Sequence, residues 1–318
     1  GFHVAICEQL SEPGHGLVDR EVVRVVTPGT VTEPGLLPQR SNNYLAAVLW
    51  RPEGAALAHA DVTTGDFHVA EFWGAEADAL LEAELRRLMP VECLTPTDQI
   101  EPFALPGFRT VRDAWHFNED GARERLQRHF DTASLEAFGC ADAPLATACA
   151  GALLAYIEQT NPALMPLMTS LRRYHAEGFL QLDSQTRRNL NLTSGARGGP
   201  EGSLLSVLDQ TKSAMGARML RRWIGQPLTD LKAVQRRQQV VEALVDHGEL
   251  RGDLRLLLDR VLDVERIVGR CRSGVASPRD LWSLYASLDV ARSVHCPDSA
   301  KLPAALSDVL GDFDPCPA

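Results

Sequence analysis

Residues 44–72 read YLAAVLWRPEGAALAHADVTTGDFHVAEF, a stretch with three apolar runs separated by two turn signals. The runs cover residues 44–50, 55–62 and 66–72. Each run has the length and composition of a strand. Pro52-Glu53-Gly54 marks the first turn and Thr64-Gly65 marks the second. The stretch therefore predicts an antiparallel meander of three strands.

The pattern after the meander alternates between helix and strand. Residues 75–88 have a helical composition that stops at Pro90. Further elements are expected as strands at 91–95 and 108–113 and as helices near 119–130 and 144–159. A meander followed by alternating helix and strand predicts an α/β or α+β domain of the ribonuclease-H-like kind.

The segment before the meander contains one expected strand, followed by a region rich in residues that break secondary structure. Residues 21–26 are rich in Val and predict a strand. Pro28, Pro34 and Pro38 follow within a few residues, together with Gly29. This density of Pro and Gly predicts a linker or extended connection.

After Asn161-Pro162 the chain becomes almost entirely helical. Ser277-Pro278-Arg279-Asp280 predicts a helix start with a Ser N-cap and an Asp at the capping-box position. A second helix is expected from Thr229-Asp230 to Gly248. A third, over about 249–273, is apolar enough to predict that it is largely buried. The sequence thus predicts a multidomain chain in which an α/β domain precedes an elongated all-α domain.

Apolar residues at helical spacing predict which faces of these helices point inward. The residues expected inward are Leu231, Val234, Val241, Leu244 and Val245 on the second helix and Leu281, Leu284, Tyr285 and Leu288 on the helix after Ser277. On a further helix, Met215, Met219, Leu220, Trp223 and Ile224 are expected to form the buried side.

The bulk composition excludes several classes of protein. With 318 residues the chain is long enough for about two domains. It lacks an apolar run of roughly 18–20 residues, so a membrane-spanning role is excluded. The seven cysteines form no C-x-x-C pair, which favours reduced thiols in a cytoplasmic protein. The chain opens without Met or a basic region, and we expect that residues have been removed upstream.

Charge is distributed unevenly along the chain. Residues 1–160 hold 24 Asp and Glu against 11 Lys and Arg, a net charge of −13. Residues 161–318 hold 18 against 21, a net charge of +3. Because binding to a phosphate backbone needs a basic surface, any contact with DNA is expected from the second half.

The sequence contains no motif for catalysis or for binding a cofactor or metal in this chain. The phosphate-binding pattern G-x-x-x-x-G-K-[S/T] does not occur, and neither does G-x-S-x-G or H-E-x-x-H. One alternative is a stand-alone ribonuclease-H-like nuclease with a helical module, using Asp61, Asp66 and Asp113 to hold paired Mg²⁺ ions. The same Asp residues also suit turns, where they accept backbone N–H bonds. A purely structural interaction module is a third reading.

Arg218, Arg221 and Arg222 lie three and four residues apart, hence on one face of a predicted helix. They are the candidates for contact with a DNA backbone. A solvated basic face opposite the buried side explains the same pattern.

Short strings of distinctive composition are spread along the chain. They are VAICEQ (4–9), REVVRVVTPGT (20–30), DVTTGDF (61–67), LD (182–183), TRRNL (186–190), SVLD (206–209), MGARMLRRW (215–223), DVERI (263–267) and SPRDL (277–281). In this order they resemble the MutS family of DNA mismatch-repair proteins, from the first residues to about residue 292.

The resemblance implies a domain plan. Residues 1–27 would be the end of the mismatch-binding domain, 28–42 a linker, 43–160 the ribonuclease-H-like connector domain, and 161–318 the first part of the helical core or lever domain. The Phe-x-Glu mismatch wedge would lie upstream, and the clamp tips and ATPase domain would lie beyond Ala318. Phe117-Asn118-Glu119 matches the three-letter wedge pattern but falls in the connector, so we interpret it as a decoy.

The resemblance also implies a function. MutS proteins are dimeric ATPases that bind mismatched duplex DNA in an ATP-dependent manner and signal to MutL in the bacterial cytoplasm, in association with the nucleoid. ATP and Mg²⁺ would bind the full-length protein. This chain would link the nucleotide state at one end of that protein to the DNA state at the other. The family's connector contacts MutL near the predicted helix 119–130. Glu124 and Arg125 are the candidates for that contact, because Leu126 and Phe130 should face the core.

Overall fold

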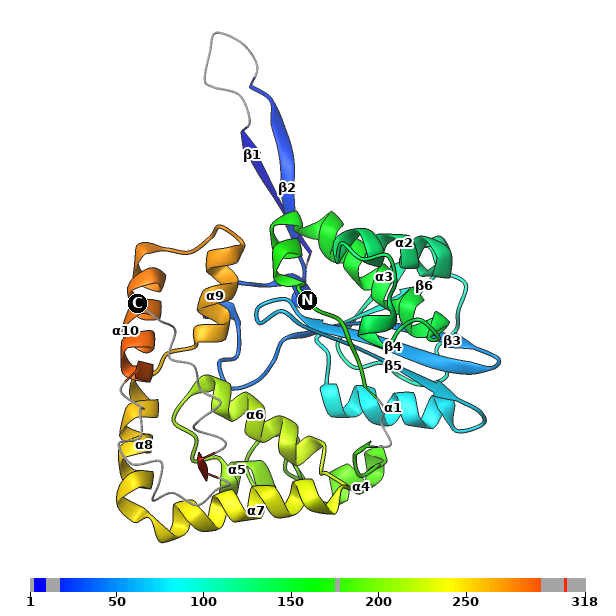
Figure 1. Cartoon of the computed structure of the whole chain (residues 1–318). Coiled ribbons are helices and arrows are strands. Elements are labelled where there is room, and N and C mark those ends of the chain that lie inside the picture. The colour runs from blue at the N-terminus through cyan, green and yellow to red at the C-terminus, as the bar shows by residue number, and fades with distance from the viewer. Residues whose placement is uncertain (1–2, 10–17, 175–177, 293–305, 308–318) are drawn as a thin grey trace. The chain divides into compact units, whose positions relative to one another are not determined.

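The computed structural model of the chain describes residues 3–9, 18–174, 178–292 and 306–307 (Figure 1). The chain divides into two compact units at residues 175 and 176. Two short segments, 182–185 and 272–274, cluster with the first unit. The first unit is a mixed α/β structure, and the second is helical.

The first unit begins with a hairpin that is separate from its main sheet. Strands β1 (Val4–Gln9) and β2 (Arg20–Val26) pair in antiparallel fashion, with a register shift between Ile6 and Cys7. The linker that follows forms two short 3₁₀ turns, η1 (Pro28–Thr30) and η2 (Pro34–Leu36). The strand and the Pro-rich connection that the sequence predicts are therefore both present.

The main sheet has six strands in the order β7-β6-β3-β4-β5-β8. Their bounds are β3 (Tyr44–Arg51), β4 (Gly54–Asp61), β5 (Asp66–Trp73), β6 (Glu92–Pro96), β7 (Phe108–Arg112) and β8 (Arg172–Arg173). β3, β4 and β5 pair in antiparallel fashion, which confirms the predicted meander. β6 runs parallel to β3, β7 to β6, and β8 to β5, so the sheet is mixed.

Helices cover both faces of this sheet (Figure 1). The long helix α3 (Pro144–Thr160) and α2 (Glu119–His129) lie on one face, and α1 (Ala77–Leu88) lies on the other. The remaining turns are η3 (Ala114–Phe117), η4 (Glu136–Phe138) and η5 (Pro162–Leu167). All eight residues of β4 are buried, because its alternate side chains enter a core on each side.

The close packing of α2 against α3 depends on small residues. A Cβ added at Gly151 would lie 2.3 Å from the Cβ of Ala122, well inside contact distance. Gly is therefore required at this crossing, although it lowers the intrinsic stability of a helix. Leu126, Leu153 and Leu154 complete the core on this face of the sheet.

The second unit is helical, and two of its helices, α7 and α10, begin at the predicted caps. The helices from 184 onward are α4 (Ser184–Asn189), α5 (Leu204–Leu208), α6 (Ala214–Gly225), α7 (Leu231–Asp246), α8 (Gly248–Arg260), α9 (Val264–Arg272) and α10 (Pro278–Arg292). Asp230 caps α7 by accepting a bond from the Ala233 amide at 2.7 Å. Ser277 and Asp280 cap α10 reciprocally, which confirms the predicted capping box.

The single buried helix expected over about 249–273 is wrong in two respects. The chain leaves the helix between α8 and α9, where Asp263 accepts a bond from the amide of Arg266 and pairs with an arginine of α6. A short carboxylate used in this way starts a new helix rather than continuing the old one. α8 also has no buried residue, and Leu256 is 70% exposed.

The predicted inward faces of α6, α7 and α10 also need correction. The apolar residues that the structure leaves exposed are Met219, Trp223, Leu231, Val241, Val245, Leu281 and Tyr285. The residues buried on α7 and α10 are instead Ala243, Ser287 and Val290. Helical spacing identifies an apolar stripe, but it does not show whether another part of the described chain covers that stripe.

The cysteines of the described chain are free thiols. Cys93, Cys140 and Cys149 are buried, whereas Cys7 is exposed. Burial, with a smaller contribution from Glu92, raises the pKa of Cys93 to about 12, which makes it unreactive at neutral pH. Cys296 and Cys316 lie outside the described residues. Within the described chain, every helix is too short or too polar to cross a bilayer.

Candidate functional site

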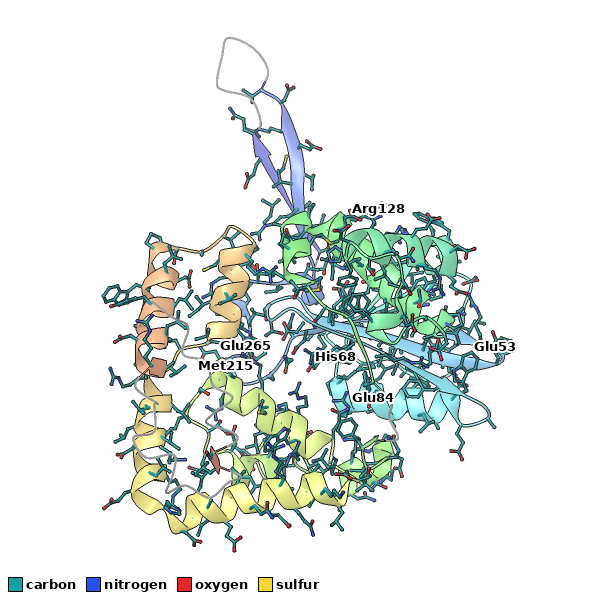
Figure 2. All side chains as sticks on the ribbon, in the orientation of Figure 1. Glu53, His68, Glu84, Arg128, Met215 and Glu265 are labelled. Carbon is teal, nitrogen blue, oxygen red and sulfur yellow. The ribbon has the colours of Figure 1, made fainter. Side chains whose placement is uncertain are left out.

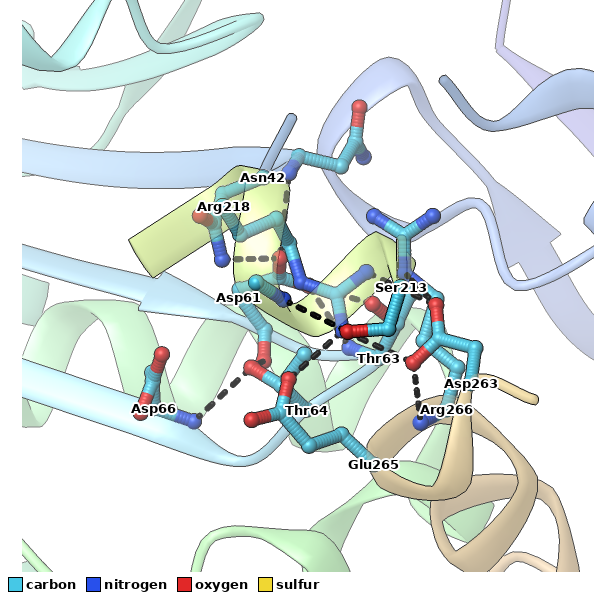
Figure 3. Close-up of polar contacts among 12 residues, drawn as sticks. Asn42, Asp61, Thr63, Thr64, Asp66, Ser213, Arg218, Asp263, Glu265 and Arg266 are labelled. Carbon is cyan, nitrogen blue, oxygen red and sulfur yellow. Dashed lines mark hydrogen bonds and ion pairs between the residues drawn. The ribbon is translucent and has the colours of Figure 1, made fainter. Parts of the chain in front are cut away.

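Asp61 is the centre of a polar turn at one end of the sheet (Figure 3). Its side chain is fully buried, and both of its oxygens accept hydrogen bonds. Oδ2 accepts from Asn42 Nδ2 at 2.9 Å and from the Asn43 amide at 3.1 Å. Oδ1 accepts from the amide of Thr63 at 3.0 Å and from its hydroxyl at 2.6 Å. The carboxylate therefore stabilises the β4–β5 turn.

The three Asp residues of the nuclease alternative do not converge. Asp61 and Asp66 are paired across the β4–β5 turn, opposite Tyr44 at the start of β3. Asp113 follows the last residue of β7, which runs in the same direction as β3. Asp113 thus lies at the opposite end of the sheet. Paired metal ions need carboxylates at one place, so this arrangement does not favour a nuclease.

Arg218 on α6 is buried in a charged cluster and is not a surface residue (Figure 3). Its side chain is 4% exposed. The guanidinium donates to both oxygens of Asp263 at 2.7 Å and to Glu265 Oε2 at 2.6 Å. A bidentate pair of this kind fixes both partners, so Arg218 holds α6 against the start of α9. The prediction that Arg218 faces a DNA backbone is corrected accordingly.

The two other arginines of α6 differ from Arg218 and from each other. Arg221 is half-buried, and burial lowers its pKa, with Asp209 acting weakly in the opposite direction. Arg222 is exposed. The three residues therefore do not form one solvated face. Arg222 is the member of the set whose side chain is free to reach a phosphate group.

A second ion pair joins α9 to α10. Both Arg270 Nε and Nη2 donate to Asp280 Oδ1, with the Nε distance at 3.1 Å. The same Asp280 caps α10 through Ser277. Hydrogen bonds from Arg270 are the largest cause of a pKa of Asp280 far below its ordinary value. One carboxylate thus fixes the start of α10 and its neighbour.

A cluster of titratable side chains lies between α1 and the sheet of the first unit. Glu84 accepts two bonds from Arg87 and one from the hydroxyl of Tyr174, at 2.6 Å. His59 stacks on His68 at 5.4 Å between ring centroids. Burial, followed by the charges of His68 and Arg87, holds the pKa of His59 well below its usual range. Figure 2 labels His68 and Glu84 in this region. The members of this cluster come from distant segments of the chain, so no local pattern in the sequence indicates it.

The α2 candidates for a partner contact also differ from each other. Glu124 is exposed, as is Arg128 on the same helix (Figure 2). Arg125 is half-buried, and its Nη1 donates to the carbonyl of Gly151 on α3 at 3.3 Å. Arg125 therefore contributes to the packing of α2 on α3, whereas Glu124 is available on the surface.

A pocket of about 700 Å³ opens beside the start of α2. It is lined by Trp115, Phe117, Asn118 and Arg125, with Arg51 from the end of β3. Trp115 is exposed and stacks on His116, with 3.6 Å between ring centroids. Phe117 is buried, so it cannot act as a wedge in DNA, in agreement with its interpretation as a decoy. Trp115, which comes shortly after β7, is the sequence signal that could have indicated this pocket.

The chain thus has an α/β unit and a helical unit. In the helical unit, ion pairs join α6 to the start of α9 and α9 to α10. Three models of successive MutS domains match the chain. MutS domain I matches residues 1–34, MutS domain II matches 43–169, and MutS domain III matches 185–310. The chain belongs to the MutS family of DNA mismatch repair proteins.

Curated relatives agree with this assignment. The DNA mismatch repair protein MutS of Symbiobacterium thermophilum is 44% identical over 304 residues, which cover 92% of this chain and 35% of the relative. MutS of Dehalococcoides mccartyi is 38% identical over 322 residues, covering 100% of this chain and 37% of the relative. MutS of Acaryochloris marina is 42% identical, and the match covers 91% of this chain and 34% of the relative. The chain thus spans a little over a third of the length of the first two of these relatives.

Proposed function

We propose that this chain is the transmitting part of a MutS-type protein that recognises mismatched duplex DNA in an ATP-dependent manner. The observation that carries the proposal is the match to MutS domains I, II and III in unbroken order. In this proposal ATP and Mg²⁺ bind elsewhere in a longer, homodimeric protein. The relatives are bacterial, which supports action in the bacterial cytoplasm on nucleoid DNA.

The topology of the first unit supports its assignment as a ribonuclease-H-like connector domain. Five of the six strands in its main sheet have the order β5-β4-β3-β6-β7, with β4 alone antiparallel to its neighbours. This arrangement comes from a meander followed by a crossover through α1 to β6 and by a helix-free connection to β7. A connector of this type would join the mismatch-binding side to the helical core.

DNA contact by this chain is proposed for the helical half. The first half carries a net charge of −13 and should repel a duplex. The exposed Arg222 and the half-buried Arg221 are the remaining backbone candidates on α6. Contacts of this kind position a protein on DNA without reading sequence.

A chimeric protein tests the proposal directly. Residues 1–292 would replace the matching segment of the Symbiobacterium relative, which is 44% identical to this chain. The chimera should prefer a G·T heteroduplex to a homoduplex and release DNA when ATP is added, as measured by fluorescence anisotropy. A folded chimera that binds both duplexes equally would contradict the proposal.

The 318-residue chain alone is the control for the chimera. It should bind homoduplex and heteroduplex equally weakly, and that binding should fade as salt rises from about 50 to about 200 mM. Calorimetry with Mg·ATP should detect no saturable binding, since the phosphate-binding pattern is absent from the sequence. Micromolar ATP binding, or a clear preference for the heteroduplex, would refute this division of roles.

A further inference from the structure

Glu92, the first residue of β6, is a carboxylate buried completely inside the first unit. Burying a charge is costly unless hydrogen bonds or an opposite charge compensate it. In the described chain Glu92 accepts four hydrogen bonds, and its ionic partner is His3, whose Nε2 lies 3.7 Å from Oε1. His3 is 37% exposed, so the four hydrogen bonds provide most of the compensation.

The two oxygens of Glu92 contact different parts of the unit. Oε2 accepts from the hydroxyl of Thr27 at 2.6 Å and from the amide of Gly29 at 2.8 Å, and both residues belong to the linker after β2. Oε1 accepts from the hydroxyl of Thr110 on β7 at 2.7 Å and from that of Tyr156 on α3 at 2.6 Å. One carboxylate therefore joins the linker to the sheet and its covering helix.

The linker is shaped to reach this carboxylate. Thr27 and Thr30 hydrogen-bond to each other at the ends of η1, at 3.0 Å between hydroxyls. Asn43 Nδ2 donates to the carbonyl of Pro28 at 2.9 Å. A Cβ added at Gly29 would lie 2.7 Å from Leu45 Cδ1 and 3.0 Å from Glu92 Oε2. The backbone thus approaches the sheet as closely as a glycine allows.

The donors around Glu92 suit a carboxylate. All four groups donate, and an ionised carboxylate is an acceptor on both oxygens. Glutamine could keep much of the arrangement, because its oxygen can accept from Thr27 and Gly29. The hydroxyls of Thr110 and Tyr156 can then turn to accept from its NH₂ group. Methionine has a similar length and removes both acceptors, which leaves the donors unsatisfied. Burial and the nearby Glu92 raise the pKa of Tyr156 well above its ordinary value, so its hydroxyl keeps its proton at neutral pH.

We propose that Glu92 is a positioning residue that fixes the exit of the β1–β2 hairpin to the α/β unit by bridging the linker on one oxygen and β7 and α3 on the other. The bridge itself does not depend on the proposed function. Only its use does, which would be to transmit changes from the mismatch-binding side. The experiment below contains no DNA or nucleotide, so its failure is separable from failure of the proposed function.

Peptide-resolved hydrogen exchange on the 318-residue chain tests the bridge. Glu92→Met removes both acceptors and should raise the exchange of the linker, residues 27–36, by at least about tenfold, while β4 changes less than about twofold. Thr27→Val removes the linker-side hydroxyl that donates to Glu92 and also pairs with Thr30, and it should give the same local increase. Tyr156→Phe removes a donor from the other oxygen and should leave linker exchange close to that of the parent chain.

A distance measurement separates positioning from general stability. Spin labels would be placed on the exposed Cys7 of β1 and on Glu53→Cys in the β3–β4 turn (Figure 2), with Cys271, Cys296 and Cys316 changed to Ser. Glu92→Met and Thr27→Val should each broaden the distance distribution, and Tyr156→Phe should not. Unchanged linker exchange, a parallel rise in β4, or equal broadening in Tyr156→Phe would each overturn the proposal. If Glu92→Met fails to fold, the Thr27→Val and Tyr156→Phe pair decides the matter.

Discussion

The two units of this chain bury their apolar residues to very different degrees. In the α/β unit every residue of β4 is buried, and Leu57 is 0% exposed. In the helical unit α8 has no buried residue, and Trp282 on α10 is 68% exposed. The hydrophobic effect therefore stabilises the first unit, whereas charged pairs and helix caps carry a larger share in the second. The expected effects of substitution differ accordingly.

Leucine-to-alanine substitutions should reveal this difference most strongly. Leu57→Ala removes a buried side chain between two packed faces and should destabilise the first unit by about 2–5 kcal/mol. Leu256→Ala on α8 is the matched control, because its side chain is 70% exposed, and should change stability by less than about 0.5 kcal/mol. Urea unfolding followed by hydrogen exchange measures both. Equal losses would show that the exposure of α8 does not reflect its packing in solution.

Removal of Arg218 should damage the helical unit by a somewhat smaller amount. Arg218→Met leaves Asp263 and Glu265 without their shared cation, and should cost about 2–3 kcal/mol. The loss is below that of a fully buried pair because Glu265 is half exposed to water. Arg222→Met is the control, since Arg222 is exposed on the same helix. If both variants melt alike, the Arg218 cluster does not hold α6 to α9.

The sequence allowed the first unit to be predicted better than the second. Turn signals at Pro52 and Gly65 separate the three strands of the meander. Strands joined by such short turns pair with their sequence neighbours, so local patterns are enough to predict the pairing. In the second unit the cap at Ser277 gave the start of α10, because that signal is also local. Whether an apolar stripe is covered depends on a partner surface elsewhere, so the burial of α8 could not be derived.

The candidate site shows the same limit. Arg218 has the spacing of a basic helix face, but its partner Asp263 lies 45 residues further along the chain. Glu92 looks like an ordinary strand residue, although its four donors come from the linker, β7 and α3. Pairings at this separation have no signature in local composition. They become visible only when the fold brings the segments together.

Acid should affect the two units at different pH values. The folded pKa of His59 is lowered by burial, so its stabilisation is present above about pH 6.5 and is lost as pH falls towards the folded pKa. The first unit should lose about 1.4 kcal/mol per pH unit in this window. The groups facing His59 are His68, Tyr44, Tyr174 and, by charge, Arg87.

The helical unit should keep its stability against acid down to a lower pH. Burial acts to raise the pKa of Asp263, but hydrogen bonds from Arg218 outweigh it and keep the pKa below its ordinary value. Its stabilisation is thus present above about pH 3.9 and lost below. Hydrogen exchange of each unit from pH 7 to pH 4 is the measurement, with His59→Phe expected to flatten the curve of the first unit. A first unit insensitive to pH down to 4 would contradict this assignment of His59.

The smallest effect on stability is expected on α2, where the contrast falls between adjacent residues. Glu124 is exposed, so Glu124→Arg should shift the melting temperature by no more than about 2 °C. Arg125→Glu loses the bond to the Gly151 carbonyl and should cost about 1 kcal/mol. If α2 contacts MutL, as the resemblance to the MutS family implies, Glu124→Arg should nevertheless slow capture of the cognate MutL, because charges at the rim of an interface act mainly on the association rate. Surface plasmon resonance with immobilised MutL measures that rate in the chimera, and Glu53→Arg, exposed in the β3–β4 turn, is the matched control. Equal slowing by both variants would indicate a general charge effect, and no slowing by Glu124→Arg would move the proposed contact away from this face of α2.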